Sequence, residues 1–182
     1  MSIHDEIKAR IGEERLFLVE PAVLGDPVKR YLIISQEIKS LLEGPWVDEK
    51  HEQRIGRLIA DLDSFVTGGR LSVCLTPFEA GKADLGRLDR PHDEVWDLRN
   101  RDEPGLRIFG RFADVDTFVA LTWSPRSVPI LWALRVPLEN NLRNWRNQIV
   151  QCKTEWTNLF ATYQPQTGDT VHAYLSSNVV LV

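Results

Sequence analysis

The segment Asp93–Ser124 constrains the fold more than any other part of the sequence, because its apolar and polar residues alternate with the period of a β-strand. The pattern predicts three consecutive antiparallel strands, over residues 94–100, 106–112 and 117–123. Two short polar stretches separate them, one closed by Pro and Gly and the other rich in Asp, and both are typical of turns. We therefore expect a sheet built around these three strands.

The second of these strands has two unlike faces. One face consists of residues that pack into a core: Leu106, Ile108, Gly110 and Phe112. The other face presents Phe109 between Arg107 and Arg111, and Arg99 lies on the corresponding polar face of the strand before it. The sequence thus brings several guanidinium groups to one side of the predicted sheet.

Helices are predicted before the sheet. Residues 3–14 suggest a short helix, with acidic residues early and basic residues late. Asp26-Pro27 is a typical helix start, and apolar residues then repeat at helical spacing until Gly44-Pro45. Another amphipathic helix covers 48–66. Because their connection is short, we expect the last two to form an antiparallel hairpin.

Further strands are expected at 16–19, 70–75 and 130–136, and in the apolar tail within 170–182. The segment 78–92 is polar and is expected to be irregular.

A long helix is predicted after Pro137. Its apolar residues are spaced alternately four and three apart: Leu138, Leu142, Trp145, Ile149, Cys152, Trp156 and Leu159. This stripe should lie on the sheet or on the helical hairpin, and the 138–159 helix also offers a possible homo-oligomer interface. The predicted class is α+β: an N-terminal helical hairpin, a central antiparallel sheet of four to six strands, and a long C-terminal helix packed on the sheet.

Composition narrows the function classes. The chain has ordinary globular proportions, no signal-peptide core and no run of apolar residues long enough for a membrane span, so we expect a soluble, cytoplasmic protein without membrane association. The net charge is −4, yet residues 70–146 hold twelve basic side chains, eleven of them arginine, against eleven acidic ones. Such a region could gather a local phosphate-binding face, or it could present an evenly mixed surface.

No nucleotide-binding, zinc-protease or serine-hydrolase motif occurs, and the four histidines are scattered, so we expect neither metal nor cofactor. Asp114-Val115-Asp116 could chelate a cation, but a solvated hairpin turn is the more ordinary interpretation. The strand arginines likewise allow two interpretations. They could bind RNA phosphates while Phe109 stacks on a base, or they could pair with Asp97, Asp102 or Glu103.

Three short motifs resemble the RelE/ParE toxin superfamily, in particular its phage-derived and HigB-like branches. Asp97-Leu98-Arg99 stands for the "E-L-R" strand of that superfamily, Gly105–Phe109 for its "G-x-R-V-x" strand and Phe118–Leu121 for its "F-V-x-L" strand. A pair of helices precedes these strands in both. The chain length of 182 residues predicts a single domain over 1–182. The resemblance spans roughly residues 52–160 and implies a RelE-like core at 48–160, an N-terminal helical extension at 1–47 and a C-terminal strand extension at 161–182.

Active members of that superfamily are commonly ribosome-dependent mRNA endonucleases that need no metal. The resemblance implies that Arg107 and Arg111 clamp the phosphate and that Arg99 supports them. His92 is the candidate general base, although no histidine or tyrosine stands at a matched position. The chain is longer than typical toxins of the group, and Pro125-Arg126 replaces a lysine pair.

The RNA-contacting residues by this interpretation are Phe109, Arg126 and Trp123. The expected partners are RNA or the ribosome and a small antitoxin protein that covers the arginine face. The alternative is a non-catalytic protein-binding module, such as a phage or mobile-element accessory protein, with the same fold.

Overall fold

The structure is a computed structural model that describes residues 2–46, 49–77, 83–100, 105–125 and 138–182. In chain order its helices and strands are α1 (Ile3–Gly12), β1 (Leu16–Leu18), β2 (Tyr31–Ser35), α2 (Gln36–Glu43), α3 (Glu49–Val66), β3 (Leu71–Cys74), β4 (Leu85–Arg87), β5 (Trp96–Asn100), β6 (Leu106–Asp114), β7 (Thr117–Pro125), α5 (Leu138–Leu159) and β8 (Val179–Leu181). Short 3-10 turns lie at Pro91–Asp93 and Val171–Ala173. Among these described helices, none is both long and apolar enough to cross a lipid bilayer.

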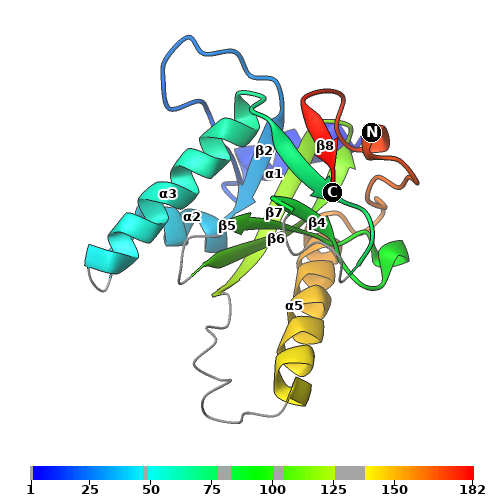
Figure 1. Cartoon of the computed structure of the whole chain (residues 1–182). Helices are drawn as coiled ribbons and strands as arrows, with labels where there is room; N and C mark the ends of the chain where they lie inside the picture. Colours follow the sequence, from blue (N-terminus) through cyan, green and yellow to red (C-terminus); the bar gives the residue numbers. More distant parts are fainter. Residues whose placement is uncertain (1, 47–48, 78–82, 101–104, 126–137) are drawn as a thin grey trace.

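All eight of these strands join one sheet in the order β1-β2-β7-β6-β5-β4-β3-β8 (Figure 1). The predicted central meander is confirmed, since β5, β6 and β7 pair antiparallel in sequence order. The sheet is larger than expected and is mixed, because β2 runs parallel to β7, and β3 runs parallel to both β4 and β8. The α+β class is confirmed.

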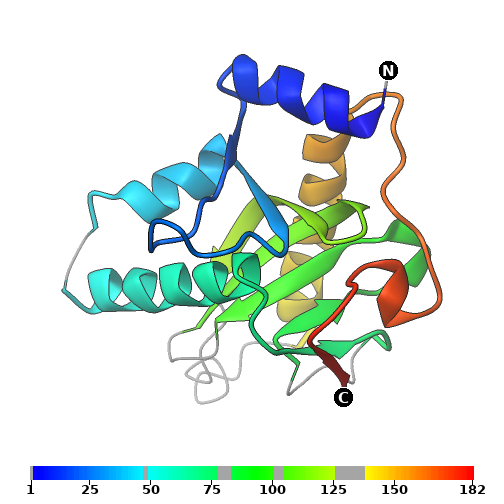
Figure 2. The same ribbon diagram turned by 90° about the horizontal axis from the view of Figure 1, so that it is seen from above.

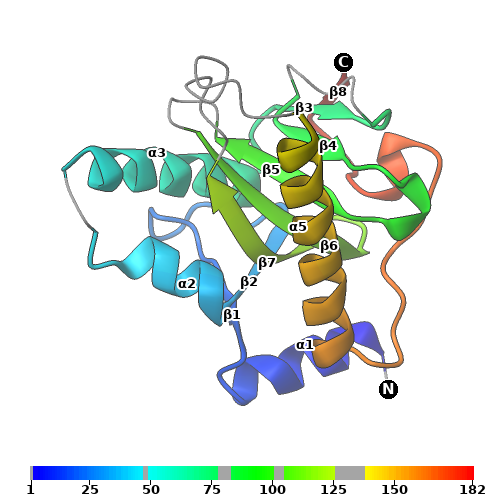
Figure 3. The ribbon, with the colours of Figure 1, turned by 90° about the horizontal axis from the view of Figure 1, so that it is seen from below.

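Helices cover both faces of this sheet. Helices α2 and α3 pack on one face, and α1 and α5 pack on the other. Figures 2 and 3 show the two layers: α5 lies behind the strands in Figure 2 and in front of them in Figure 3, while α2 and α3 stay to one side. The predicted alternation of β6 follows this division, because Ile108 and Phe112 lie in the core under α3, whereas Phe109 lies in the core under α5.

The long C-terminal helix packs on the sheet as predicted. The described residues of its stripe are buried against the sheet of the same chain: Ile149, Cys152, Trp156 and Leu159. Their partners on the sheet include Phe109, Val119 and Leu121. The stripe that was a candidate oligomer interface is thus used, over this described part, to build the second core of the chain.

The helix predicted from Asp26 to Gly44 is wrong over its first half. Residues Tyr31–Ser35 form strand β2, and the helix α2 begins only at Gln36. Leu32, Ile33 and Ile34 are all buried, because β2 lies between β1 and β7 and both of its faces are covered. A strand buried on both faces is apolar at every position, without alternation of apolar and polar residues. Its apolar residues therefore also match the spacing of an amphipathic helix.

Ser35 explains where the strand changes into the helix. Its backbone is still extended, and its hydroxyl accepts a hydrogen bond from the backbone N–H of Ile38, which is the geometry of a helix N-cap. The N-terminal 47 residues therefore contribute two strands to the sheet as well as helices.

Most of the other predicted helices and strands are confirmed, and one strand was missed. The helices at 3–14 and 48–66 and the strands at 16–19, 70–75 and in the C-terminal tail are confirmed. Strand β4 was missed, because it is only three residues long within a polar segment. The predicted strand at 130–136 lies outside the described residues.

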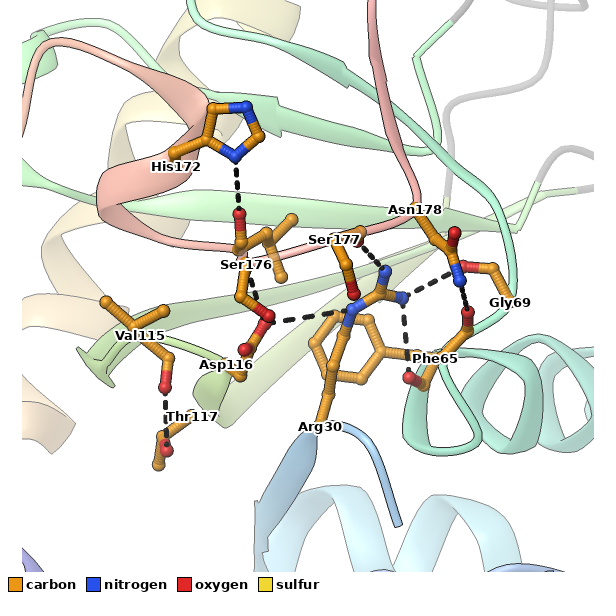
Figure 4. Close-up of polar contacts among 12 residues, drawn as sticks. Arg30, Phe65, Gly69, Val115, Asp116, Thr117, His172, Ser176, Ser177 and Asn178 are labelled. Carbon is orange, nitrogen blue, oxygen red and sulfur yellow. Dashed lines mark hydrogen bonds and ion pairs between the residues drawn. The ribbon is translucent and has the colours of Figure 1, made fainter. Parts of the chain in front are cut away.

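A buried arginine ties the ends of these elements together (Figure 4). Arg30 precedes β2, and its Nη1 donates to the carbonyl oxygens of Gly69 at 3.0 Å and Phe65 at 3.5 Å, at the C-terminal end of α3. Its Nη2 donates to the carbonyl oxygen of Ser177 at 2.7 Å, and its Nε lies 4.0 Å from Asp116 Oδ1. Burial lowers the pKa of this guanidinium, and the Asp116 carboxylate opposes that shift.

Gly110 in β6 provides a test of this sheet packing. A Cβ at Gly110 would lie 2.3 Å from the carbonyl oxygen of Val119 and 2.5 Å from the Phe118 ring. We expect Gly110→Ala to lower the free energy of unfolding by about 1–3 kcal/mol, the usual cost of overpacking. Urea denaturation measures the change.

Gly56, in α3, is the matched control, because a Cβ there meets nothing within 4 Å. Gly56→Ala should instead stabilise the protein by about 0.5–1 kcal/mol through helix propensity. Equal effects of the two substitutions would contradict the described packing of β6 on β7.

Candidate functional site

The candidate site is an arginine–carboxylate cluster on β5 and β6. The register of these strands places Arg99 directly opposite Arg107, and Asp97 opposite Phe109. Residues two apart on a strand share a face, so Asp97, Arg99 and Arg107 all lie on the face that α5 covers. We call Asp97, Arg99 and Arg107 the Asp97 cluster.

Asp97 organises the two guanidinium groups around it. Arg99 donates from Nε to Oδ2 and from Nη2 to Oδ1, both at 2.9 Å, which is a bidentate pair. Arg107 donates from Nη1 to Oδ2 at 2.6 Å. The Asp97 side chain is 0% exposed, whereas those of Arg99 and Arg107 are 12% and 20% exposed.

A buried carboxylate without a partner would be costly, so these contacts are structurally required. The sequence interpretation in which strand arginines pair with Asp97 is therefore correct for Arg99 and Arg107. The same contacts hold both guanidinium groups in one place, with two positive charges around one negative charge.

Arg111 and Phe109 are buried under α5 and form no open face with these two arginines. The Arg111 guanidinium lies 5.3 Å from the centre of the Trp156 ring, and its Nη2 donates to the carbonyl oxygen of Asp93 at 2.6 Å. Burial lowers its pKa. Phe109 lies in the same buried core as Cys152, where burial raises the pKa of the Cys152 thiol to about 12. Phe109 does lie between Arg107 and Arg111 on one strand face, but α5 covers Phe109 and Arg111 there.

The remaining predicted residues are dispersed. His92 is 71% exposed on the turn before β5, with its Nε2 at 3.9 Å from Asp93 Oδ1. Trp123 packs against the core of the opposite face, and its backbone N–H donates to Glu37 Oε1 at 3.2 Å. Arg126 lies outside the described residues. Among the predicted residues, the structure thus brings Arg99 and Arg107 together and separates Trp123 from them.

A second polar cluster was missed from the sequence. The Tyr174 hydroxyl donates to Glu94 Oε2 at 2.7 Å, and Arg87 Nη1 lies 3.7 Å from Glu94 Oε1. Burial raises the pKa of Glu94, although Tyr174 and Arg87 both oppose that shift. Burial and the Glu94 carboxylate raise the pKa of Tyr174 to about 12. No motif links these residues, which come from three separate parts of the chain.

The aspartates of the β6–β7 turn have separate protein partners. Asp114 Oδ2 lies 2.8 Å from His4 Nε2, and this contact lowers the pKa of Asp114. Asp116 Oδ1 accepts a hydrogen bond from the backbone N–H of Ser176 at 3.0 Å. Within the parts of the chain that the structure describes, no group of three or more His, Cys, Asp or Glu side chains is placed to hold a metal ion.

Comparisons with known proteins identified no relative of this chain. No model of a protein family, no curated protein and no solved structure matches the chain.

The raised pKa of Glu94 predicts that the free energy of unfolding depends on pH. A carboxyl whose pKa is raised by folding stabilises the folded state below its unfolded pKa, for which 4.5 is the ordinary value, and that contribution is lost as pH rises through the raised pKa. Glu94→Gln keeps an acceptor for Tyr174 but carries no charge. The free energy of unfolding of the variant relative to the native chain should therefore increase as pH rises above about 4.5.

Urea denaturation at a series of pH values measures this difference, and Glu43→Gln is the control because Glu43 is exposed at the end of α2. A difference for Glu94→Gln that stays constant or shrinks with rising pH would show that folding does not raise the pKa of Glu94.

Proposed function

We propose that this protein acts on RNA as a RelE-like, toxin-derived protein, and that Arg99 and Arg107 contact the RNA backbone. The observation that carries the proposal is the Asp97 cluster, in which one buried carboxylate fixes two arginines from neighbouring strands. Guanidinium groups that a carboxylate already orients before RNA binds lose little conformational freedom on contacting a phosphate. Their partial exposure keeps both at the surface of the sheet face.

The order of elements supports the same proposal. Helices α2 and α3 precede β5, β6 and β7, as the resemblance to the toxin superfamily implies. The motif at 97–99 falls on β5, most of the motif at 105–109 on β6 and the motif at 118–121 on β7. Three degenerate motifs thus lie side by side in adjacent, paired strands.

RNA cleavage is not part of the leading proposal. Arg111, which the resemblance implies as one of two phosphate clamps, lies beneath Trp156 and donates to backbone carbonyl oxygens. His92 reaches toward Asp93 on a turn, and no described contact joins it to Arg107. Binding of the RNA backbone by Arg99 and Arg107 is the step that this geometry supports.

A non-catalytic protein-binding module is the second candidate, and a different observation favours it. Several large apolar side chains are exposed from the last residue of β1 to the first residue of β2: Leu18, Val23, Leu24, Val28 and Tyr31. Exposed apolar residues that gather on one segment commonly mark protein contact sites. A protein partner would bind this segment under that alternative.

RNA binding by Arg107 can be tested without leaving Asp97 unpaired. Arg107→Gln removes the positive charge, and Asp97 keeps its bidentate pair with Arg99. We expect weaker binding of a fluorescent single-stranded oligoribonucleotide, measured by anisotropy. The slope of log K against log salt should become shallower by about 0.7, as for one lost contact to a single-strand phosphate.

Arg57→Gln is the matched control, because Arg57 is an exposed arginine on α3, which covers the opposite face of the sheet. Unchanged affinity in Arg107→Gln, or an equal loss in Arg57→Gln, would refute a specific contact at the Asp97 cluster. Growth after induction in bacteria then distinguishes a toxin from a harmless binder: the toxin proposal predicts arrest that Arg107→Gln relieves and Arg57→Gln does not.

A further inference from the structure

A pocket of about 220 Å³ lies between α3 and the strands β3 and β5. Its walls include the buried apolar residues Leu58, Leu62 and Leu98, which belong to the core between α3 and the sheet. Polar side chains that can accept hydrogen bonds also line it, among them Asp61 on α3, Asp84 just before β4, and Asn100 at the end of β5. The pocket therefore combines an apolar wall with a set of oxygen acceptors.

Asn100 is the most informative of these residues. It is 2% exposed, and its Nδ2 donates to Asp61 Oδ2 at 2.9 Å. That hydrogen bond fixes the orientation of the amide, so the oxygen is the atom that faces away from Asp61. Asn100 Oδ1 is buried and has no hydrogen-bond partner. Buried amide oxygens nearly always have a donor, and a ligand donor would satisfy this one.

The charges around the pocket restrict the ligand. Arg70 also lines it, so the pocket is not simply acidic. The Arg99 guanidinium does not offset these carboxylates, because it pairs with Asp97 on the other face of the sheet. A bare metal ion would need several oxygen ligands at short range, and the described residues contain no such group. Directional N–H donors match the acceptors better, because an ammonium group carries three of them on one atom.

We propose that this pocket binds a small organic molecule with a primary ammonium group, which donates to Asn100 Oδ1 and lies beside the Asp61 carboxylate. The aliphatic part of the ligand then packs against Leu58, Leu62 and Leu98. This site is independent of the proposed RNA contact at Arg107, and its test contains no RNA.

The experiment is a titration of the full chain with n-butylammonium chloride, followed by ¹H–¹⁵N spectra. Tetramethylammonium chloride is the matched probe, because it carries the same charge without an N–H donor. The expected result is a saturable shift of the Asn100 side-chain amide signals with n-butylammonium alone. Equal shifts with both salts would overturn the proposal, since they would report ionic strength rather than a directional contact.

Two variants locate the binding. Asn100→Leu removes the unpartnered oxygen and should weaken n-butylammonium binding at least tenfold. Asp61→Asn is the second variant, because Asp61 is at an exposed helical position where substitution leaves the fold intact even if Asn100→Leu does not fold. It should also weaken n-butylammonium binding. Asp26→Asn is the control, because Asp26 is an exposed residue of the loop between β1 and β2. Unchanged binding in Asp61→Asn, or an equal loss in Asp26→Asn, would refute the site.

Discussion

The buried carboxylate of Asp97 is the constraint on which the candidate site depends. A charge removed from water must be paired, and here two guanidinium groups from adjacent strands pair with one side chain. The sheet register supplies the geometry, because it places Arg99 opposite Arg107. One structural requirement therefore both stabilises the strand pair and concentrates positive charge on one sheet face.

The position of α5 decides which arginines can act at the surface. An amphipathic helix needs an apolar area to cover, and Phe109, Val119 and Leu121 provide one on the same face as the strand arginines. Arg111 is enclosed by this packing, and it satisfies its donors with backbone carbonyl oxygens and its charge with the Trp156 ring. Arg107, four residues earlier on β6, remains partly exposed.

Much of the fold was predictable because its signals are local. The meander at 96–125, the helix α3 and the apolar stripe of α5 each repeat with a period that the sequence shows directly. Strand β2 was misassigned because burial on both faces removes alternation, and β4 is too short to show a period. The mixed pairing of the sheet depends on which distant strands meet, and no local pattern encodes that.

The candidate site was only partly predictable for the same reason. Alternation correctly placed Arg99, Arg107, Phe109 and Arg111 on one face, but it could not show that α5 would cover two of them. Contacts such as those of Tyr174 with Glu94 join residues 80 positions apart. The buried Arg30, which joins α3, the β6–β7 turn and the C-terminal segment, had no sequence signal beyond a single arginine before a strand.

The most direct test of the central claim is to observe the arginine side chains during RNA binding. Nuclear magnetic resonance of the Nε–H groups, with an uncleavable 2′-O-methyl oligoribonucleotide, reports each guanidinium separately. The account predicts that the Arg99 and Arg107 signals shift together and saturate, while the Arg111 signal under Trp156 stays in place. Unchanged Arg99 and Arg107 signals, with shifts confined to α3 or to the loop between β1 and β2, would contradict it.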